Sequence, residues 1–195
     1  MTNQQTLDLQ SAKLREHIEE IAALRLDVAS IADGLSNGQF SWRPSTRGWS
    51  VGQCIEHVTR TLQLYPEKIE TMIGEARLRE SRGERPFREG AFTRWFIRSM
   101  EPPPGLRVRT MGVVDPPVGL ERDVVLARFE AELSRLAGLI RAADGVSLQH
   151  ARTRSPFVPI IQFTLGQVFA LNLAHSRRHL WQARQVTQRP GFPQS

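Results

Sequence analysis

The segment TLGQVFALNLAHSRRHLWQARQV, residues 164–186, says most about the fold. Thr164 and Gln167 have the spacing of a capping box, in which each side chain satisfies a free backbone N–H at the start of a helix. Apolar residues then recur every three or four positions, which places them on one face of a helix. The segment therefore predicts a long amphipathic helix that opens at Thr164.

Two histidines occur on the inward face of this predicted helix. His175 and His179 are four residues apart, so their side chains project from one side, one turn apart. The same side carries Leu165, Val168, Phe169, Ala183 and Val186, together with Asn172 and Ser176. Burying two imidazoles is costly unless they gain partners, and a divalent metal would provide them. The pair is a candidate metal site, with hydrogen-bonded packing as the open alternative.

Helical spacing of apolar residues also predicts three earlier helices, which span about residues 4–35, 50–72 and 120–143. Ser50 and Gln53 form a second capping box, and Pro66 is expected to kink the second helix. Residues 81–119, rich in arginine and proline, are expected to form an irregular crossover connection, and 188–195 a flexible tail. No strand is predicted. The chain is expected to be all-α, a single domain over 1–195 built as a four-helix bundle.

Composition argues against several classes of protein. The formal charge is +6, and the central segment has an excess of arginines: Arg82, Arg85, Arg88, Arg94, Arg98, Arg107 and Arg109. Nucleic acid is still not the expected partner, because arginines elsewhere alternate with glutamates and no reading motif is present. The lone Cys54 excludes an internal disulfide and a cysteine-based zinc cluster. With no membrane span or secretory signal in the pattern, a soluble cytoplasmic protein is expected.

His57, in the second predicted helix, is the natural third ligand for the histidine pair. It lies to one side of the apolar stripe of that helix, which would place a metal near the mouth of the bundle, where water or substrate can reach it. Hydrogen-bonded packing in the core is the alternative. His17 and His150 are expected at the surface or in loops, and Cys54 as a small buried apolar residue.

Three fragments together resemble a known family. They are FSWRPSTRGW at 40–49, the run WS followed by EHV at 49–58, and the closing helix with LGQ and AHSRRHLWQ. This order and spacing resemble the DinB-like (DinB/YfiT) superfamily of small metal-binding four-helix proteins. The resemblance implies that His57, His175 and His179 ligate one divalent metal, which could be zinc, nickel, iron or manganese. Residues 81–119 match no motif of that family.

The residues around the histidines disfavour two other metal enzymes. Ser176 stands where a zinc peptidase helix carries its general-base glutamate. A ferritin-type di-iron site needs glutamate three residues before histidine, and this chain has Cys54, Asn172 and Ser176 there.

Three functions remain as expectations. The resemblance implies a metal-dependent enzyme. It could be a transferase that joins a low-molecular-weight thiol to an electrophilic small molecule in detoxification or stress response, or it could be a hydrolase. Asn172 could orient the substrate. The alternatives are a non-catalytic bundle with structural histidines or a structural metal, with a homodimer left open, and an anion- or nucleic-acid-binding module that uses the central arginines.

Overall fold

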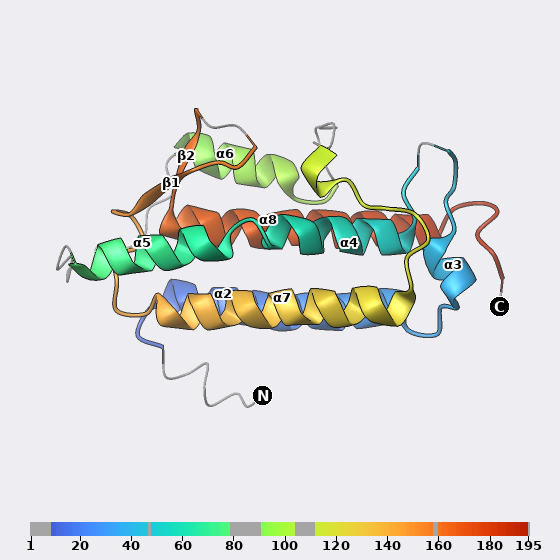
Figure 1. Ribbon diagram of the computed structural model, residues 1–195, viewed down its shortest axis with the longest axis horizontal. Helices are drawn as coiled ribbons and strands as arrows, with labels where there is room; N and C mark the ends of the chain where they lie inside the picture. Colours follow the sequence, from blue (N-terminus) through green and yellow to red (C-terminus); the bar gives the residue numbers. More distant parts are fainter. Residues whose placement is uncertain (1–8, 47, 79–90, 104–111, 158–159, 195) are drawn as a thin grey trace.

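The computed structural model describes residues 9–46, 48–78, 91–103, 112–157 and 160–194. Its main helices are α2 (Ala12–Ala32), α4 (Val51–Leu62) continued by α5 (Pro66–Leu78), α7 (Arg122–Ala142) and α8 (Leu165–Thr187). Helix α4 packs on α8, α8 on α2, α2 on α7 and α7 on α4, which closes a four-helix bundle (Figure 1). The predicted all-α four-helix fold is confirmed.

One hydrophobic core fills the bundle and draws on all of these helices. Its largest fully buried side chains include Phe40, Phe129 and Phe169. Helices α4 and α8 lie side by side in this core. His57 on α4 is therefore next to the α8 segment that carries His175 and His179.

Both predicted capping boxes are present. The Ser50 hydroxyl accepts from the Gln53 N–H at 3.1 Å, and the Gln53 side-chain oxygen accepts from the Ser50 N–H at 3.2 Å. Thr164 and Gln167 make the same reciprocal bonds at 3.4 and 2.9 Å. These bonds satisfy two free donors at the start of each helix and so fix where α4 and α8 begin.

Pro66 begins a new helix and does not kink a continuous one. Helix α4 stops at Leu62, and Pro66 is the first residue of α5. Proline has no N–H, and the first residue of a helix has no intrahelical partner for one, so a new helix starts there without loss. The predicted single helix over 50–72 is therefore two helices joined by a short turn.

The first helix is shorter than its apolar pattern. It begins at Ala12, because the Ser11 hydroxyl caps it by accepting from the Leu14 N–H at 3.4 Å. It ends at Ala32, just before Gly34, which adopts a φ of 73° that favours glycine. Residues 4–8 of the prediction lie outside the described part of the chain.

Two short strands are present where none was predicted from the sequence. Strands β1 (Arg152–Arg154) and β2 (Gln162–Thr164) form an antiparallel pair in which Arg152 faces Thr164. Three-residue strands are too short to show the alternating pattern that identifies a strand in a sequence. The pair closes the connection that leads into α8.

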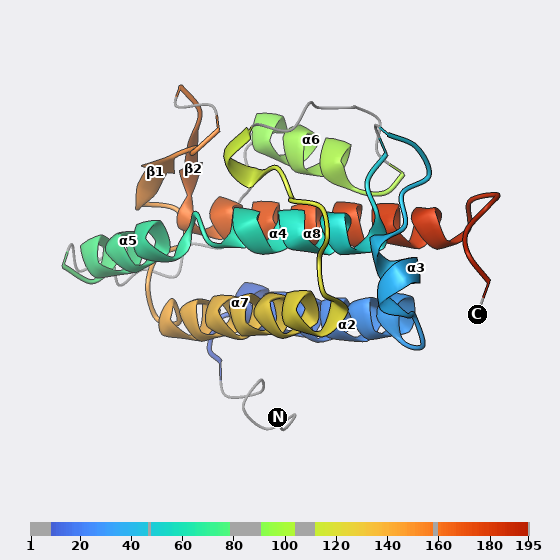
Figure 2. The same ribbon diagram turned by 45° about the vertical axis from the view of Figure 1, so that its right-hand side comes forward.

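The crossover connection is partly helical. The described part of residues 81–119 contains α6 (Ala91–Met100) and a 3-10 turn, η1 (Gly112–Val114). Helix α6 packs on α8 through Ile97, and η1 contacts α4. Both cover the face of α4 and α8 that points away from α2 and α7 (Figure 2). The connection that was expected to be irregular is thus helical over Ala91–Met100.

The end of the chain contacts the bundle. Phe192 packs against the core and meets the Trp42 ring edge-on, with centroids 5.5 Å apart. The Pro193 carbonyl accepts from the Gln39 side chain of α3 (Asn37–Ser41) at 3.0 Å. The predicted flexible tail is thus anchored over its described part.

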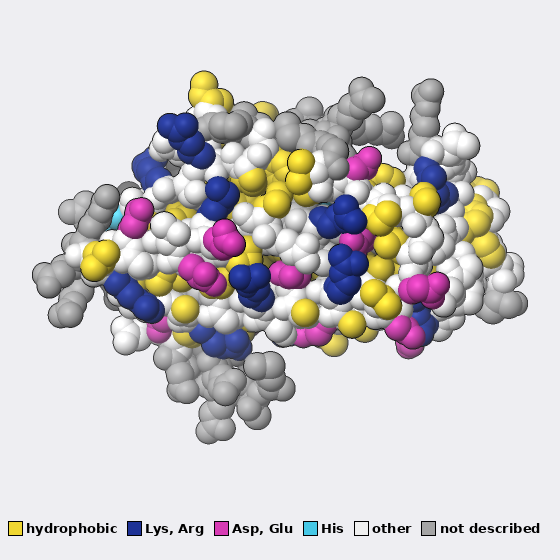
Figure 3. Space-filling model, in the orientation of Figure 1, with side chains coloured by type: hydrophobic (Ala, Val, Ile, Leu, Met, Phe, Trp, Pro, Cys, Tyr) yellow, Lys and Arg dark blue, Asp and Glu magenta, His cyan; other side chains and the backbone are white. Residues whose placement is uncertain are grey.

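Charges of both signs are mixed on the face shown in Figure 3. Between α2 and α7, Arg25 pairs with Glu130 at 2.8 Å. Of the central arginines, Arg82, Arg85, Arg88, Arg107 and Arg109 lie outside the described residues, as does the side chain of Arg94. Within the described helices, none is both long and apolar enough to cross a membrane.

Candidate metal centre

Three histidines from α4 and α8 converge on one point. One ring nitrogen from each of His57, His175 and His179 lies within 4.8 Å of the other two. The Nε2 atoms of His57 and His175 are 3.4 Å apart. The ring centroid of His179 lies 4.5 Å from that of His57 and 4.5 Å from that of His175. The sequence spacing of 118 residues between His57 and His175 is bridged by the packing of α4 on α8.

Two of the rings have their outer nitrogen fixed by an oxygen. The Nδ1 atom of His57 donates to the Val114 carbonyl at 2.9 Å, and that of His179 to the side-chain oxygen of Gln182 at 3.0 Å. Because both oxygens can only accept, each Nδ1 carries the proton and each Nε2 carries a lone pair. Outer bonds of this kind orient histidine ligands in metal sites.

The surroundings favour the neutral form of all three rings. Burial lowers the pKa of His57, against smaller raising effects of the Val114 hydrogen bond and the Asp115 charge. Burial and the neighbouring charges of His57 and Arg178 lower the pKa of His175 to about 3. The pKa of His179 lies well below its ordinary value, chiefly through burial. Neutral imidazole is the form that binds a metal, so the rings need not lose a proton at pH 7.

The donor set fits a divalent ion. Three neutral nitrogens match the protein ligands of catalytic zinc sites, which leave a fourth position for water or substrate. Among the described residues, this cluster of histidines contains no carboxylate or thiolate. A hydrogen bond between His175 and His57 is the metal-free alternative at the observed 3.4 Å.

Trp49 forms one wall of the centre. Its ring centroid lies 4.9 Å from that of His57 and 5.8 Å from that of His179. His57 is only 5% exposed and His179 8%, whereas His175 is partly exposed. His57 was expected at an open edge of the bundle, but the segment around Val114 covers its side of α4. Solvent therefore reaches the centre on the side of His175.

Comparison with known proteins identifies the family of this chain and a structure with a similar fold. The family model described as DinB superfamily matches residues 20–183. The chain belongs to the DinB superfamily. Its fold is similar to that of YfiT from Bacillus subtilis, described as a probable metal-dependent hydrolase with an unusual four-helix bundle topology. That match has a TM-score of 0.57 and 13% identity, and covers 96% of this chain and 89% of the other. A search of curated proteins finds no match.

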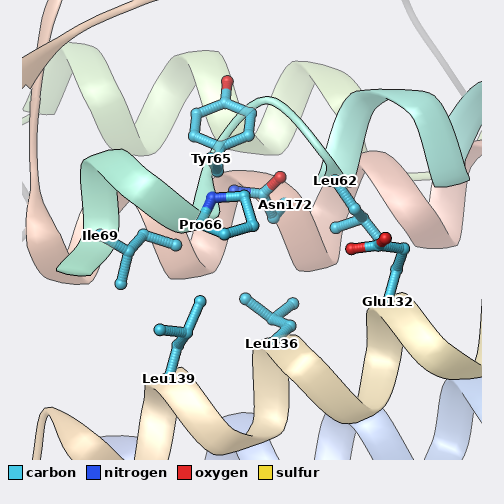
Figure 4. Close-up of a pocket in the computed structure, with 8 residues that line it drawn as sticks. All are labelled: Leu62, Tyr65, Pro66, Ile69, Glu132, Leu136, Leu139 and Asn172. Atoms are coloured by element: carbon cyan, nitrogen blue, oxygen red, sulfur yellow. The ribbon is translucent and has the colours of Figure 1, made fainter.

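Asn172, the candidate for orienting substrate, occupies a different place in this DinB fold. It lines a pocket at the turn between α4 and α5, whose lining residues include none of the three histidines (Figure 4). Its side-chain nitrogen donates to the Val168 carbonyl at 2.8 Å, and its buried Oδ1 has no hydrogen-bond partner among the described residues. Asn172 shares a helix with His175, but the structure does not bring its amide among the rings.

His17 is buried, which corrects its predicted surface position. It is 1% exposed, its Nδ1 lies 3.3 Å from a Glu20 oxygen, and its ring meets Phe169 edge-on. The sequence did hold the signal: His17 lies three residues after Leu14 and four before Ile21, on the apolar side of α2. His150 is exposed, as expected.

Cys54 behaves as the small buried apolar residue that the sequence predicted. It has no exposed surface, and burial raises the pKa of its thiol. A thiol kept protonated in this way is a poor nucleophile and a poor metal ligand.

Sequence reasoning missed four neighbours of the rings. They are Trp49, Val114, Gln182 and Arg178. Gln182 could have been found, because it lies three residues after His179 and so on the same side of the helix. The Val114 contact could not, because a backbone carbonyl leaves no trace in the residue type.

Proposed function

We propose that this chain is a metal-dependent enzyme in which His57, His175 and His179 hold one divalent ion, and that it joins a low-molecular-weight thiol to an electrophilic small molecule. The observation that supports the proposal is the convergence of three neutral rings, two of which have Nδ1 bonded and Nε2 left for a metal. Zinc, nickel, iron and manganese are all candidate ions, because imidazole ligands discriminate weakly among them.

A divalent ion held by these rings would lower the pKa of a thiol or water bound to it and so supply a nucleophile at neutral pH. The neutral ligands leave both positive charges of the ion uncompensated. Arg178 adds a positive charge close enough to affect the pKa of His175 and His179. This electrostatic environment favours an anionic nucleophile such as a thiolate.

The proposed reaction replaces the leaving group of the electrophile by the thiol sulfur, and the leaving group departs with the electrons of its bond to carbon. The thiol sulfur attacks an electrophilic carbon, a sulfur–carbon bond forms, the bond to the leaving group breaks, and the thiol proton passes to solvent. Trp49 would contribute by presenting a flat apolar surface beside His57 and His179, where it excludes water from one side of the centre.

Water is the competing nucleophile. YfiT, which shares the fold, is described as a probable metal-dependent hydrolase, and the same three rings could serve hydrolysis. The two reactions differ in one measurable respect, since only transfer requires the thiol.

The test compares both reactions in one protein. Metal-free protein is reloaded separately with each candidate ion, then supplied with 1-chloro-2,4-dinitrobenzene plus glutathione or cysteine, or with p-nitrophenyl acetate and no thiol. We expect metal-dependent thioether formation that His175→Ala reduces to the rate without protein. His150→Ala, which changes an exposed histidine, should leave the rate unchanged.

Two results would contradict the proposal. Metal-dependent ester hydrolysis without thioether formation would replace transfer by hydrolysis. A fully loaded protein that accelerates neither reaction would favour a structural metal in a non-catalytic bundle.

A further inference from the structure

A short segment, Val114 to Pro117, is held on α4 through four consecutive backbone carbonyls; we call it the strap. The pairs are Val114 with His57 Nδ1 at 2.9 Å, Asp115 with Arg60 Nη1 at 3.1 Å, and Pro116 and Pro117 each with Gln53 Nε2 at 3.3 Å. All three donors lie on α4, at positions 53, 57 and 60, one turn apart. His57, a candidate metal ligand, is thus the middle one of three α4 side chains that donate hydrogen bonds to the strap.

The neighbouring bonds restrict the carbonyl that His57 needs. Val114 and Asp115 belong to adjacent peptide units, each of which is planar, so holding the Asp115 carbonyl limits how the Val114 carbonyl can turn. The next two residues are prolines, which stiffen the backbone and offer no N–H for other bonds. The position of the Val114 oxygen therefore depends on Arg60 and Gln53.

Arg60 is itself fixed by a buried carboxylate. Glu56 has no exposed surface, and its Oε1 accepts from Arg60 Nε at 2.9 Å and from Arg128 Nη2 at 3.1 Å. Because the guanidinium is planar and rigid, the bond at Nε sets the direction of Nη1, which reaches Asp115. Glu56 thereby aims Arg60 at the strap.

Gln53 has a fixed orientation as well. Its Oε1 accepts from the Ser50 N–H at 3.2 Å in the capping box, which requires the oxygen to point to the helix start. The amide nitrogen must then point to the strap, where two carbonyls accept from it. One side chain therefore both starts α4 and holds the strap.

We propose that Gln53 and Arg60 are positioning residues for His57: they hold the strap so that the Val114 carbonyl keeps the proton on Nδ1 and directs Nε2 toward His175 and His179. The effect on metal affinity rests on the proposed function, whereas the effect on the ring does not. Loss of outer bonds to ligating histidines typically weakens metal binding about 10- to 100-fold. We expect about a tenfold loss of metal affinity, at the lower end of this range, because Gln53 and Arg60 act on His57 only through the strap.

The first variant is Gln53→Glu. Glutamate keeps the capping-box acceptor but removes the donors to the strap. Its negative charge alone would attract a cation, so weaker binding would report lost positioning. Gln39→Glu is the matched control, since Gln39 also caps a helix, with Ser36, and donates to the Pro193 carbonyl at 3.0 Å.

The second variant, Arg60→Lys, protects against failure to fold. Lysine keeps a positive charge for the buried Glu56 but lacks the rigid fork that reaches Asp115 at the same time. Arg128, which pairs with Glu56 at 3.1 Å, is unchanged in this variant and provides a second positive charge for the buried carboxylate.

Two measurements decide the inference. Nitrogen-15 NMR of the metal-free protein reports which nitrogen of His57 carries the proton, and competition titration with Zn²⁺ reports affinity. We expect the Nδ1–H form in wild type and Gln39→Glu, a mixture of both forms in Gln53→Glu and Arg60→Lys, and about tenfold weaker Zn²⁺ binding in those two.

Retention of the pure Nδ1–H form in both strap variants would overturn the inference, as would wild-type Zn²⁺ affinity in both. If wild-type protein bound no metal, the NMR result would still decide the positioning role, and the proposed function alone would fail.

Discussion

At the level of single side chains, the three histidines share surroundings that disfavour a positive charge. Burial lowers the pKa of each ring, that of His175 to about 3 and that of His179 well below its ordinary value. In the unfolded chain these rings would take up protons near their ordinary pKa of about 6.5. The metal-free folded protein therefore binds fewer protons than the unfolded chain in mildly acidic solution.

This difference predicts a pH-dependent stability. For the metal-free protein, the free energy of unfolding should fall as the pH drops from 7 to 5, by at most about 1.4 kcal/mol per pH unit for each ring that stays neutral. The ordinary pKa values of Asp and Glu side chains, about 4, lie below this window, so the slope chiefly reports histidines. Urea unfolding at each pH measures it, and His175→Ala should have a smaller slope. Equal slopes in both proteins would contradict the pKa assignment of His175.

Much of the site could be predicted at this scale, and some could not. His175 and His179 follow from a spacing of four on an apolar face, because helix geometry alone puts them together. His57 was a candidate third ligand because it lies in another predicted helix, beside the apolar stripe of that helix, and the resemblance to a family supported this choice. The Val114 carbonyl was beyond sequence reasoning, because its position depends on the strap.

At the level of elements, the start of α4 is shaped by close packing against α3. A Cβ added at Gly52 would lie 2.5 Å from the Phe40 ring and 3.3 Å from the Phe40 carbonyl oxygen. Phe40 is fully buried and has no room to give way. This contact places the helix that carries His57.

A pair of glycine variants tests this packing. Gly52→Ala should lower the free energy of unfolding by about 1–3 kcal/mol through overpacking. Gly138→Ala in α7, where no other described part of the chain lies within 4 Å of the added carbon, should raise it by about 0.5–1 kcal/mol. Urea unfolding of both proteins provides the comparison. Similar effects of the two substitutions would show that the Phe40 contact does not constrain α4.

Element boundaries were predictable where a local signal exists. The capping boxes at Ser50 and Thr164 were predicted at the positions where the structure has them. The start of the first helix was placed too early, because apolar residues at helical spacing also precede the Ser11 cap. Strands β1 and β2 were missed because three residues are too few to show an alternating pattern.

At the level of the whole molecule, the proposed ion would join two helices that are far apart in the chain. A ligand that binds only the folded state stabilises it by an amount set by concentration and affinity. At a free Zn²⁺ concentration of 100 times Kd, the gain is about 2.7 kcal/mol, or about 5–10 °C in Tm for a chain of this size. Thermal unfolding with Zn²⁺ and with chelator should show this shift, and His57→Ala should abolish it. A shift that survives in His57→Ala would place the ion elsewhere.

The bundle itself was predictable at this scale, because four amphipathic segments in one chain must bury their apolar faces together. The placement of α6 and η1 over α4 and α8 was not, since the arginine- and proline-rich sequence before and between them has no periodic pattern. Within this cover, Val114 of η1 lies against His57 and covers that side of the centre.

Metal content after equilibrium dialysis tests the central claim most directly. Chelator-treated wild-type protein and His175→Ala are dialysed against Zn²⁺ at pH 7, and bound zinc is measured by elemental analysis. Three converging imidazoles predict about one equivalent in wild type and almost none in the variant. Less than half an equivalent in wild type, or equal amounts in both proteins, would contradict the account.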